Sequence, residues 1–332
     1  MKNLLVISND KIFYSKTKIS SQFNDTINIL EALQKKFKIF LLSRNDYIKH
    51  NFKLSRKKIS RLSFKNIFFL KKKRFKVFII SITPFNLFYY LVLKILFKNI
   101  SGFVLLRSDG FREYKVKFGR FGYVFFSMMM KVIIKHIKVI SVNKKIKSYR
   151  TDYLIFPSEL DKDWFKKNNK LKYSLLKLLY FGRYKKEKGI FFLIELLKNQ
   201  DLKFQLTVAG SKSYNSRDTQ NVKYIGELHD KKDIIKLYDD HQIFILPSYT
   251  EGSPKVILES LARKKPVIVF NEIKHVKSNF NGIFVCKRNI KDLNNMVNYI
   301  IKNYSKIINN MTKNQLPTKK DFQKNLLNIV NV

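Results

Sequence analysis

Short runs of apolar residues alternate with amphipathic segments along most of the chain, a pattern typical of βαβ units with parallel strands. In the first half, the pattern predicts strands at residues 3–8, 37–43, 65–70, 76–81, 102–109 and 137–142, with helices at 26–36 and 84–97. In the second half, it predicts strands at 177–183, 204–210, 222–227, 243–248 and 266–270, with helices at 189–200, 231–241 and 253–264. The predicted fold class is therefore α/β, with two doubly wound domains whose ligands bind at the carboxyl ends of strands.

The length of 332 residues suits two domains, each large enough to bury its own core. We expect the first domain at 1–165, the second at 166–315, and a final amphipathic helix at 316–332 that crosses back to the first domain. A strand ends near Pro157, and the polar segment after it, rich in Lys and Asn, is the expected hinge at 160–174.

The formal net charge is +43, from 67 Lys and Arg against 24 Asp and Glu. Such a charge suits partners that are anionic, such as a nucleic acid or a membrane surface. The surplus is mostly Lys and accompanies many Asn, Ile and Phe, so a composition bias is an alternative explanation. The distribution is uneven, because residues 1–150 carry +28 and residues 151–332 carry +15.

The strongly cationic half also contains an apolar, aromatic segment at 77–97, directly after the basic run 71–76. Its length would allow a membrane span, but Pro84, Asn86 and Lys94 interrupt it, so we expect a strand followed by an apolar helix that contacts lipid. A basic surface beside apolar side chains suits an anionic bilayer. The N-terminus has too short an apolar run for a signal peptide and is expected to form the first strand.

Cysteine and histidine usage argues against a disulfide or a metal site. The single cysteine, Cys286, can form no internal disulfide, which is consistent with a cytoplasmic protein. None of the five histidines has metal-ligand spacing, although His229 is expected near a bound nucleotide. The string Asp-Lys-Asp at 161–163 matches an Asp-x-Asp metal motif by letters only, because it falls in the interdomain turn.

Ser253 and Pro254 mark a predicted helix start, with Ser as the N-cap and Pro at the first helical position. The strand before them leads through a short loop into this helix, whose free N–H groups and dipole favour an anion such as phosphate. Gly252 allows close approach of a ligand to the backbone. Two glutamates flank this corner, Glu251 in the loop and Glu259 within the helix.

Two carboxylates would repel a bare phosphate, but each can accept hydrogen bonds from a vicinal diol. A phosphate between two diols describes a nucleoside diphosphate sugar. Arg183 and Lys188 follow another strand and are five residues apart across a turn, so both can face a diphosphate at the strand end. The alternative is a capped amphipathic helix whose glutamates face solvent.

The second half resembles the retaining GT-B glycosyltransferases of family 4, the glycosyl transferases group 1. The segment YFGRYKKEKGIFFLIELL is similar to the family's G-R-x(4)-K-G element, and LPSYTEGSPKVILESLARKKPVI to its E-x(7)-E signature. FQLTVAG and VKYIGEL are similar to the strands between them. The resemblance covers residues 150–285 and implies two Rossmann-like domains facing a central cleft that holds the donor.

The resemblance also implies roles for single residues. Arg183 and Lys188 would bind the donor diphosphate, and Glu259 the ribose diol of the nucleotide. Glu251, with the backbone of Gly252, Ser253, Pro254 and Lys255, would contact the transferred sugar and its phosphate. These groups and the helix start would stabilise the leaving group, so the family needs no metal and no cofactor.

The base would lie near Gly226 to Leu228. The chain departs from the family in its first half, whose first strand–helix loop lacks the usual glycine pair. No histidine stands where many members have one after an N-terminal strand, and Asp109 ends that strand instead. Asp109 and Glu251 are therefore the candidate catalytic residues, and a plain turn at Asp109 and Gly110 is the alternative.

We therefore expect a retaining glycosyltransferase that moves a sugar from a nucleotide diphosphate donor to a carbohydrate or lipid-linked glycan, in cell-surface polysaccharide biosynthesis. Its expected place is the cytoplasm, in peripheral contact with the anionic inner face of the plasma membrane. One alternative is a GT-B nucleotide-sugar epimerase, which acts on the donor alone. The other is a basic nucleic-acid-binding protein, which does not explain the two glutamates or the ordered strand-end motifs.

Overall fold

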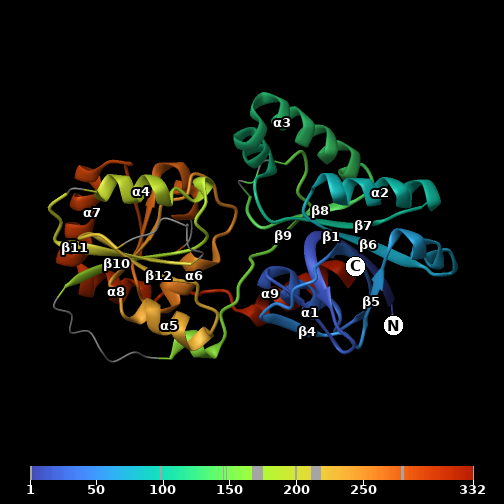
Figure 1. The fold of residues 1–332 in the computed structure, drawn as a ribbon, viewed down its shortest axis with the longest axis horizontal. Helices are drawn as coiled ribbons and strands as arrows, with labels where there is room; N and C mark the ends of the chain where they lie inside the picture. Colours follow the sequence, from blue (N-terminus) through green and yellow to red (C-terminus); the bar gives the residue numbers. More distant parts are fainter. Residues whose placement is uncertain are drawn as a thin grey trace. The chain divides into compact units, whose positions relative to one another are not determined.

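The chain folds into two units, Met1–Pro157 together with Lys320–Val332, and Ser158–Lys319 (Figure 1). The computed structural model describes residues 2–97, 99–144, 146, 148–166, 175–198, 200–210, 218–277 and 280–331. The division lies at Pro157, before the predicted boundary at residue 165, because Leu160 and Trp164 are buried in the core of the second unit. Residues 167–174 of the expected hinge lie outside the described residues.

A parallel sheet in the first unit has the strand order β5-β3-β1-β6-β7-β8-β9, and the short strands β2 and β4 extend it antiparallel from the end of β1. The strands are β1 (Lys2–Tyr14), β2 (Lys18–Ser21), β3 (Phe37–Asn45), β4 (Phe52–Ser55), β5 (Ile59–Leu62), β6 (Phe75–Ile80), β7 (Gly102–Leu106), β8 (Lys138–Ser141) and β9 (Tyr153–Leu154). The strand order reverses between β1 and β6, and this reversal is the switch point of a doubly wound sheet.

Helices cover both faces of this sheet, α2 and α3 on one side and α1 and α9 on the other (Figure 1). Their bounds are α1 (Asn24–Leu33), α2 (Pro84–Leu96), α3 (Gly110–Ile134) and α9 (Lys319–Asn331). α2 begins as its sequence suggests, because Thr83 accepts a hydrogen bond from the Asn86 N–H and Pro84 occupies the first turn. α9 buries Phe322, Leu326 and Val330 in the core of the first unit.

The strand predicted at residues 65–70 is wrong, because this segment lies in a 3-10 helix, η1 (Phe64–Lys72). Its buried residues are Ile67 and Leu70, three apart, while Phe68 and Phe69 are exposed. A strand would bury alternate residues instead. The composition of residues 65–70 is therefore typical of a strand, but the spacing of their buried positions is that of a helix.

The second unit contains a parallel sheet of order β12-β11-β10-β13-β14-β15, with its switch point between β10 and β13. The strands are β10 (Leu176–Phe181), β11 (Phe204–Ala209), β12 (Val222–Gly226), β13 (Ile243–Leu246), β14 (Val267–Phe270) and β15 (Ile283–Cys286). The helical segments are η2 (Lys162–Phe165), η3 (Lys186–Lys188), α4 (Ile190–Leu197), α5 (Lys231–Asp239), α6 (Lys255–Ala262), η4 (Asn271–Lys277), α7 (Ile290–Lys302) and α8 (Tyr304–Met311).

The neighbouring strands β13 and β14 of this sheet are apolar at every position, as expected where helices cover both faces. All of β13 and all of β14 are buried. The thiol of Cys286, at the end of β15, is buried too, and burial raises its pKa to about 12. This cysteine therefore behaves as a small core side chain.

Within the part of the chain that the structure describes, no helix is both long enough and apolar enough to cross a bilayer. The apolar segment at 77–97 divides, as predicted, into the strand β6 and the helix α2.

Candidate active site

The loops that follow β10 and β13 lie next to each other at the carboxyl edge of the second sheet, because these two strands are neighbours at its switch point. The Tyr249 N–H donates to the Glu187 carbonyl at 3.0 Å and so joins the two loops directly. In doubly wound sheets this position is where ligands bind. Most of the residues that the sequence nominated lie in these two loops and in α6.

Two glycines let the loops pack backbone against backbone. Gly189 has φ +67°, and a Cβ there would lie 2.0 Å from the Pro247 carbonyl oxygen. Gly210, after β11, has φ +123°, and a Cβ there would lie 2.0 Å from the carbonyl oxygen of Gly182. Neither position has room for a side chain, so backbone groups line this part of the edge.

Lys188 and Glu251 form an ion pair between the two loops. The Lys188 Nζ donates to Glu251 Oε1 at 2.6 Å, and the Ser248 hydroxyl donates to the same oxygen at 2.6 Å. The Glu251 side chain is 9% exposed and that of Lys188 20%. The second oxygen, Oε2, makes no hydrogen bond to any described residue. The pair is therefore held in place yet reachable from solvent.

Arg183 is exposed beside this pair, at the start of the loop after β10. Its carbonyl accepts a hydrogen bond from the buried Tyr180 hydroxyl at 2.8 Å, which fixes the backbone at this point. Burial first, and the nearby Glu251 carboxylate second, raise the pKa of Tyr180, so its hydroxyl stays protonated. No described carboxylate lies within ion-pair distance of the Arg183 guanidinium.

The start of α6 differs from the prediction by one position. Pro254 is the N-cap, with extended backbone (φ −73°, ψ 112°), and no side chain caps the helix, so Ser253 is not the N-cap. Pro254 cannot donate to the first turn, and Lys255 is the first helical residue. The Lys255 side chain donates to Glu159. Gly252 is buried directly before this turn.

Glu259 lies in the second turn of α6 and faces Tyr238 on α5. The Tyr238 hydroxyl donates to Glu259 Oε2 at 2.9 Å. Burial, and then the Glu259 carboxylate, raise the pKa of Tyr238 well above its usual value. Tyr238 thus remains a donor that orients the carboxylate, and a carboxylate has capacity for several further hydrogen bonds.

Gly226 and Leu228 follow β12 at the far side of the same edge. Gly226 has φ +85°, and a Cβ there would meet nothing within 4 Å, so its surroundings are open. Leu228 packs against the core of the second unit. His229 is exposed beyond them, 3.5 Å from Glu227.

Sequence reasoning missed Arg288, which supports the loop after β13. Its guanidinium donates to the Pro247 carbonyl at 2.9 Å and to Glu272 at 2.8 Å, and lies 4.2 Å from the centre of the Tyr249 ring. An isolated arginine carries no motif, and β15 before it was not among the predicted strands, so no pattern in the sequence marked this residue.

Asp109 belongs to the first unit and is the N-cap of α3. Its carboxylate accepts from the Arg112 N–H at 3.2 Å, and the Arg112 Nε lies 3.8 Å from the other oxygen. Asp109 is buried. The capping geometry accounts for an acid at this position, and the structure places no other candidate site residue in this unit.

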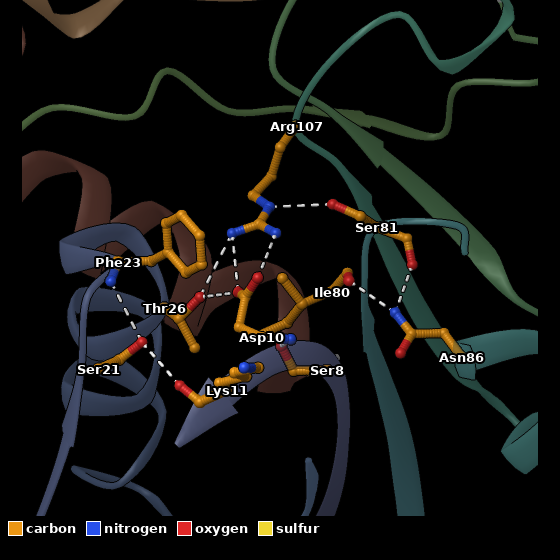
Figure 2. Close-up of polar contacts among 10 residues, drawn as sticks. All are labelled: Ser8, Asp10, Lys11, Ser21, Phe23, Thr26, Ile80, Ser81, Asn86 and Arg107. Atoms are coloured by element: carbon orange, nitrogen blue, oxygen red, sulfur yellow. Dashed lines mark hydrogen bonds and ion pairs between the residues drawn. The ribbon is translucent and has the colours of Figure 1, made fainter. Parts of the chain in front are cut away.

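The switch point of the first sheet carries a different polar cluster, formed by Asp10, Thr26, Ser81 and Arg107 (Figure 2). The Arg107 Nη1 and Nη2 lie 3.2 and 3.4 Å from the two oxygens of Asp10, and its Nε donates to Ser81 Oγ at 2.9 Å. Thr26 donates to Asp10 and accepts from Arg107. No sequence motif joins these residues, which lie far apart along the chain.

Asp10 and Ser81 owe their positions to local irregularities. The pairing of β1 with β3 shifts register between Ser8 and Lys11, and such a bulge redirects a side chain. Ser81 follows β6 with φ +68°, which is rare for a residue other than glycine. Asn86 holds this backbone, because its amide donates to the carbonyls of Ile80 and Ser81, both at 2.8 Å.

Among the described residues, no group of three or more His, Cys, Asp or Glu side chains is placed to hold a metal ion. Lys231 lies between Asp161 and Asp163 and donates to both. Hydrogen bonds from Lys166 first, and from Lys231 second, lower the pKa of Asp163 to about 2. The Asp-x-Asp string is therefore occupied by an ammonium group and ties η2 to α5.

Comparison with known proteins supports the sequence resemblance. Residues 161–316 match the family described as glycosyl transferases group 1. A Campylobacter jejuni protein is 28% identical over 32% of the chain. Its name is N,N'-diacetylbacillosaminyl-diphospho-undecaprenol α-1,3-N-acetylgalactosaminyltransferase. A protein of Bacillus subtilis named "Putative teichuronic acid biosynthesis glycosyltransferase TuaC" is 36% identical over 27% of the chain. The chain matches only 28% and 23% of the length of these relatives.

The fold is shared over nearly the whole length with solved structures, among them WaaG, a glycosyltransferase involved in lipopolysaccharide biosynthesis, at a TM-score of 0.67 and 13% identity, covering 98% of this chain and 99% of that chain. HepE of Anabaena, in complex with UDP-glucose, superposes with a TM-score of 0.67 at 13% identity, covering 100% of both chains. Nothing in the family match or among these proteins supports the epimerase or nucleic-acid alternatives. Residues 161–316 therefore form a domain of the glycosyl transferases group 1 family, in a chain with the GT-B fold of two Rossmann-like domains.

Proposed function

We propose that this protein is a retaining glycosyltransferase of family 4, which transfers a sugar from a nucleoside diphosphate donor to a glycan or lipid-linked acceptor. The observation that carries the proposal is the Lys188–Glu251 ion pair at the switch point of the second sheet. It places one cation and one carboxylate at the same strand ends, where two glycines let the loop backbones pack against each other. A donor with a diphosphate and a diol needs both kinds of group.

The diphosphate would bind Lys188 and Arg183, with the N–H groups of the first turn of α6. The N-terminus of a helix presents backbone N–H groups and the positive end of the helix dipole, which suit an anion. The positive charge would stabilise the leaving nucleoside diphosphate as the glycosidic bond to phosphate breaks, the part that a metal cation plays in other transferases. Gly252, Ser253 and Pro254 would bring the backbone to the phosphate.

The two diols would bind the two glutamates. Glu251 would accept hydrogen bonds from the transferred sugar through Oε2, while Lys188 and Ser248 hold Oε1. Glu259, oriented by Tyr238, would accept from the ribose hydroxyls. The base would lie over the open backbone at Gly226, near Leu228.

The acceptor would bind the first unit, where Asp109 would orient its reacting hydroxyl. The relatives are named for transfer to a diphospho-undecaprenol glycan and for teichuronic acid synthesis. We therefore propose a role in cell-surface polysaccharide biosynthesis, in the cytoplasm and in peripheral contact with the inner face of the plasma membrane.

Donor binding is tested by thermal shift with UDP-, GDP-, ADP- and dTDP-sugars. We expect sugars of one base to stabilise the wild type and to lose most of this effect in Glu259→Ala. The matched control is Glu195→Ala on α4, an exposed glutamate paired only along its helix with Lys198 at 3.7 Å. If no nucleotide sugar stabilises the wild type, or if Glu259→Ala responds like Glu195→Ala, the donor site is wrong.

Product analysis then separates the reaction classes. A retaining transferase consumes the stabilising donor only with an acceptor glycan, and NMR of the product shows the donor's anomeric configuration. An isomerised sugar formed from the donor alone would instead identify an epimerase.

A further inference from the structure

The helix α3 carries apolar side chains on two opposite sides. Its inner side is buried against the first sheet by Phe126, Met129 and Ile133, among others. The outer side has a second apolar row at spacings of three and four residues, the period of a helix face. Its members and their exposed fractions are Phe121 75%, Val124 55%, Met128 59% and Val132 40%.

A kink enlarges this outer face near the start of the helix. Phe118 and Gly119 depart from helical geometry, with Gly119 at φ +62°. Phe118 is 60% exposed, and Phe121 stacks on Phe125 with ring centres 6.1 Å apart and planes within 6°. Large aromatic rings therefore protrude where ordinary helix packing would bury them.

The neighbouring elements repeat the pattern. α2 lies on the same side of the first sheet as α3 (Figure 1) and exposes Phe88, Leu91 and Ile95, again one helix face. The 3-10 helix η1 joins it, because the rings of Phe64 and Phe88 lie 6.3 Å apart. We call the outward residues of η1, α2 and α3 the apolar-basic face, formed by Phe64, Phe68, Phe69, Phe88, Leu91, Ile95, Phe118, Phe121, Val124, Met128 and Val132.

Positive charge surrounds these side chains almost without acids. Residues 47–151 contain 26 Lys and Arg but only two acids, Asp109 and Glu113. Asp109 is buried as a helix cap. Lysine ammonium groups lie directly over exposed rings of the face, Lys71 5.4 Å from the centre of Phe68 and Lys73 4.8 Å from that of Phe69.

Resting on the peripheral membrane contact of the proposed function, we propose that the apolar-basic face is the docking surface for an anionic lipid bilayer, into which its side chains insert between the headgroups. Amphipathic helices with apolar and basic sides bind membranes in this way, lying in the interface without crossing it. A second copy of the chain would bring like charge against like charge. Nucleic acid could stack on the exposed phenylalanines of this face, but it would leave its aliphatic side chains, such as Leu91, Ile95 and Val124, uncovered, whereas lipid chains would cover both kinds.

Vesicle flotation tests the proposal with the full chain, phosphatidylcholine vesicles, and vesicles containing about a quarter phosphatidylglycerol. We expect binding to the anionic vesicles at about 150 mM salt, weakened further by salt because the charges lie at the surface. Phe121→Ser with Met128→Ser should lower the partition coefficient by at least roughly tenfold, since two large side chains lose their burial in lipid. Lys71→Gln with Lys73→Gln should lower the partition coefficient on anionic vesicles only.

The matched control is Tyr299→Ser with Ile301→Ser on α7 of the second unit, which are 54% and 40% exposed. This variant should bind vesicles like the wild type, and all variants should keep the wild-type melting temperature and donor-induced shift. An unchanged donor-induced shift would show that loss of vesicle binding is independent of the donor site, so the membrane proposal and the proposed function can fail separately.

Three results would overturn the proposal. The first would be a wild type that does not float with anionic vesicles. The second would be a Phe121→Ser with Met128→Ser variant that floats as well as the control. The third would be a variant that leaves vesicle binding unchanged but dissolves a dimer seen by light scattering, or abolishes binding to an RNA of mixed sequence. The face would then belong to a second copy or to a nucleic acid.

Discussion

The two sheets have the same kind of switch point but build it from different residues. In the second sheet, glycines at 189 and 210 let loop backbones touch, and the Lys188–Glu251 pair lies above them. In the first sheet, no glycine precedes Gly102 in the sequence, and side chains of Asp10, Ser81 and Arg107 fill the strand ends.

The two sheet edges differ in which of their polar groups can still bind a ligand. Around Gly189 and Gly210 the loop backbones pack directly on each other, and the N–H groups of these glycines donate to the carbonyls of Lys186 and Gly226. The groups that can meet a ligand at this edge are therefore the side chains of Lys188 and Glu251. At the other switch point, each nitrogen of the Arg107 guanidinium already donates to Asp10, Thr26 or Ser81. We infer that the second edge binds a ligand, whereas the first is braced by its own side chains.

The largest effect is expected from Gly189→Ala. Its φ of +67° and the Pro247 oxygen 2.0 Å from a new Cβ force both loops apart. The free energy of unfolding should fall by about 3 kcal/mol, through strain and overpacking together, and donor binding should be lost. Guanidinium denaturation and the thermal-shift assay measure the two effects.

Gly226→Ala is the control for backbone strain alone. Its φ is also positive, +85°, but a Cβ would meet nothing within 4 Å. The loss should be only about 1 kcal/mol. Equal losses for the two variants would mean that close packing of the loops does not define the second edge.

Removing the cation from each edge should give different results for donor binding. Lys188→Met should weaken donor binding by roughly 1.5–3 kcal/mol, the value of a hydrogen bond to a charged group, and it should also lower the free energy of unfolding, because the Glu251 carboxylate, 9% exposed, loses its cation. Arg107→Met leaves the Asp10 carboxylate, which is 12% exposed, without its cation. It should lower the free energy of unfolding by about 2 kcal/mol while the donor dissociation constant stays the same.

Isothermal titration with the stabilising donor and guanidinium denaturation give the two quantities for both variants. If Arg107→Met weakens donor binding as much as Lys188→Met does, the first edge takes part in donor binding. The inference that only the second edge binds the donor would then be wrong.

Apolar strands and the E-x(7)-E corner were predictable because each depends on residues close in sequence. All five strands predicted in the second half are present, since buried parallel strands are continuously apolar. Glu251 and Glu259 were likewise recognisable from their spacing around Gly252. The roles assigned to them stay predictions until a donor is bound.

The remaining features depend on contacts that local pattern does not encode. α3 was missed because Phe121 and Met128 on its outer side are as apolar as Phe126 and Met129 on its inner side, which removes the contrast of an amphipathic helix. The cluster around Arg107 joins segments brought together only by sheet order. Ser81 has no sequence signal for a positive φ.

Ser81 gives the smallest and most specific test of the braced edge. Ser81→Ala keeps the strained φ of +68° but removes the hydroxyl that accepts from Arg107 at 2.9 Å, so it should lower the free energy of unfolding by about 1 kcal/mol. Ser81→Gly loses the same bond but relieves the backbone strain, also worth about 1 kcal/mol, so the two effects should nearly cancel. Denaturation of the two variants side by side measures the difference. Equal losses would show that the strain at Ser81 is negligible, and no loss for Ser81→Ala would show that the hydroxyl bond does not hold this edge.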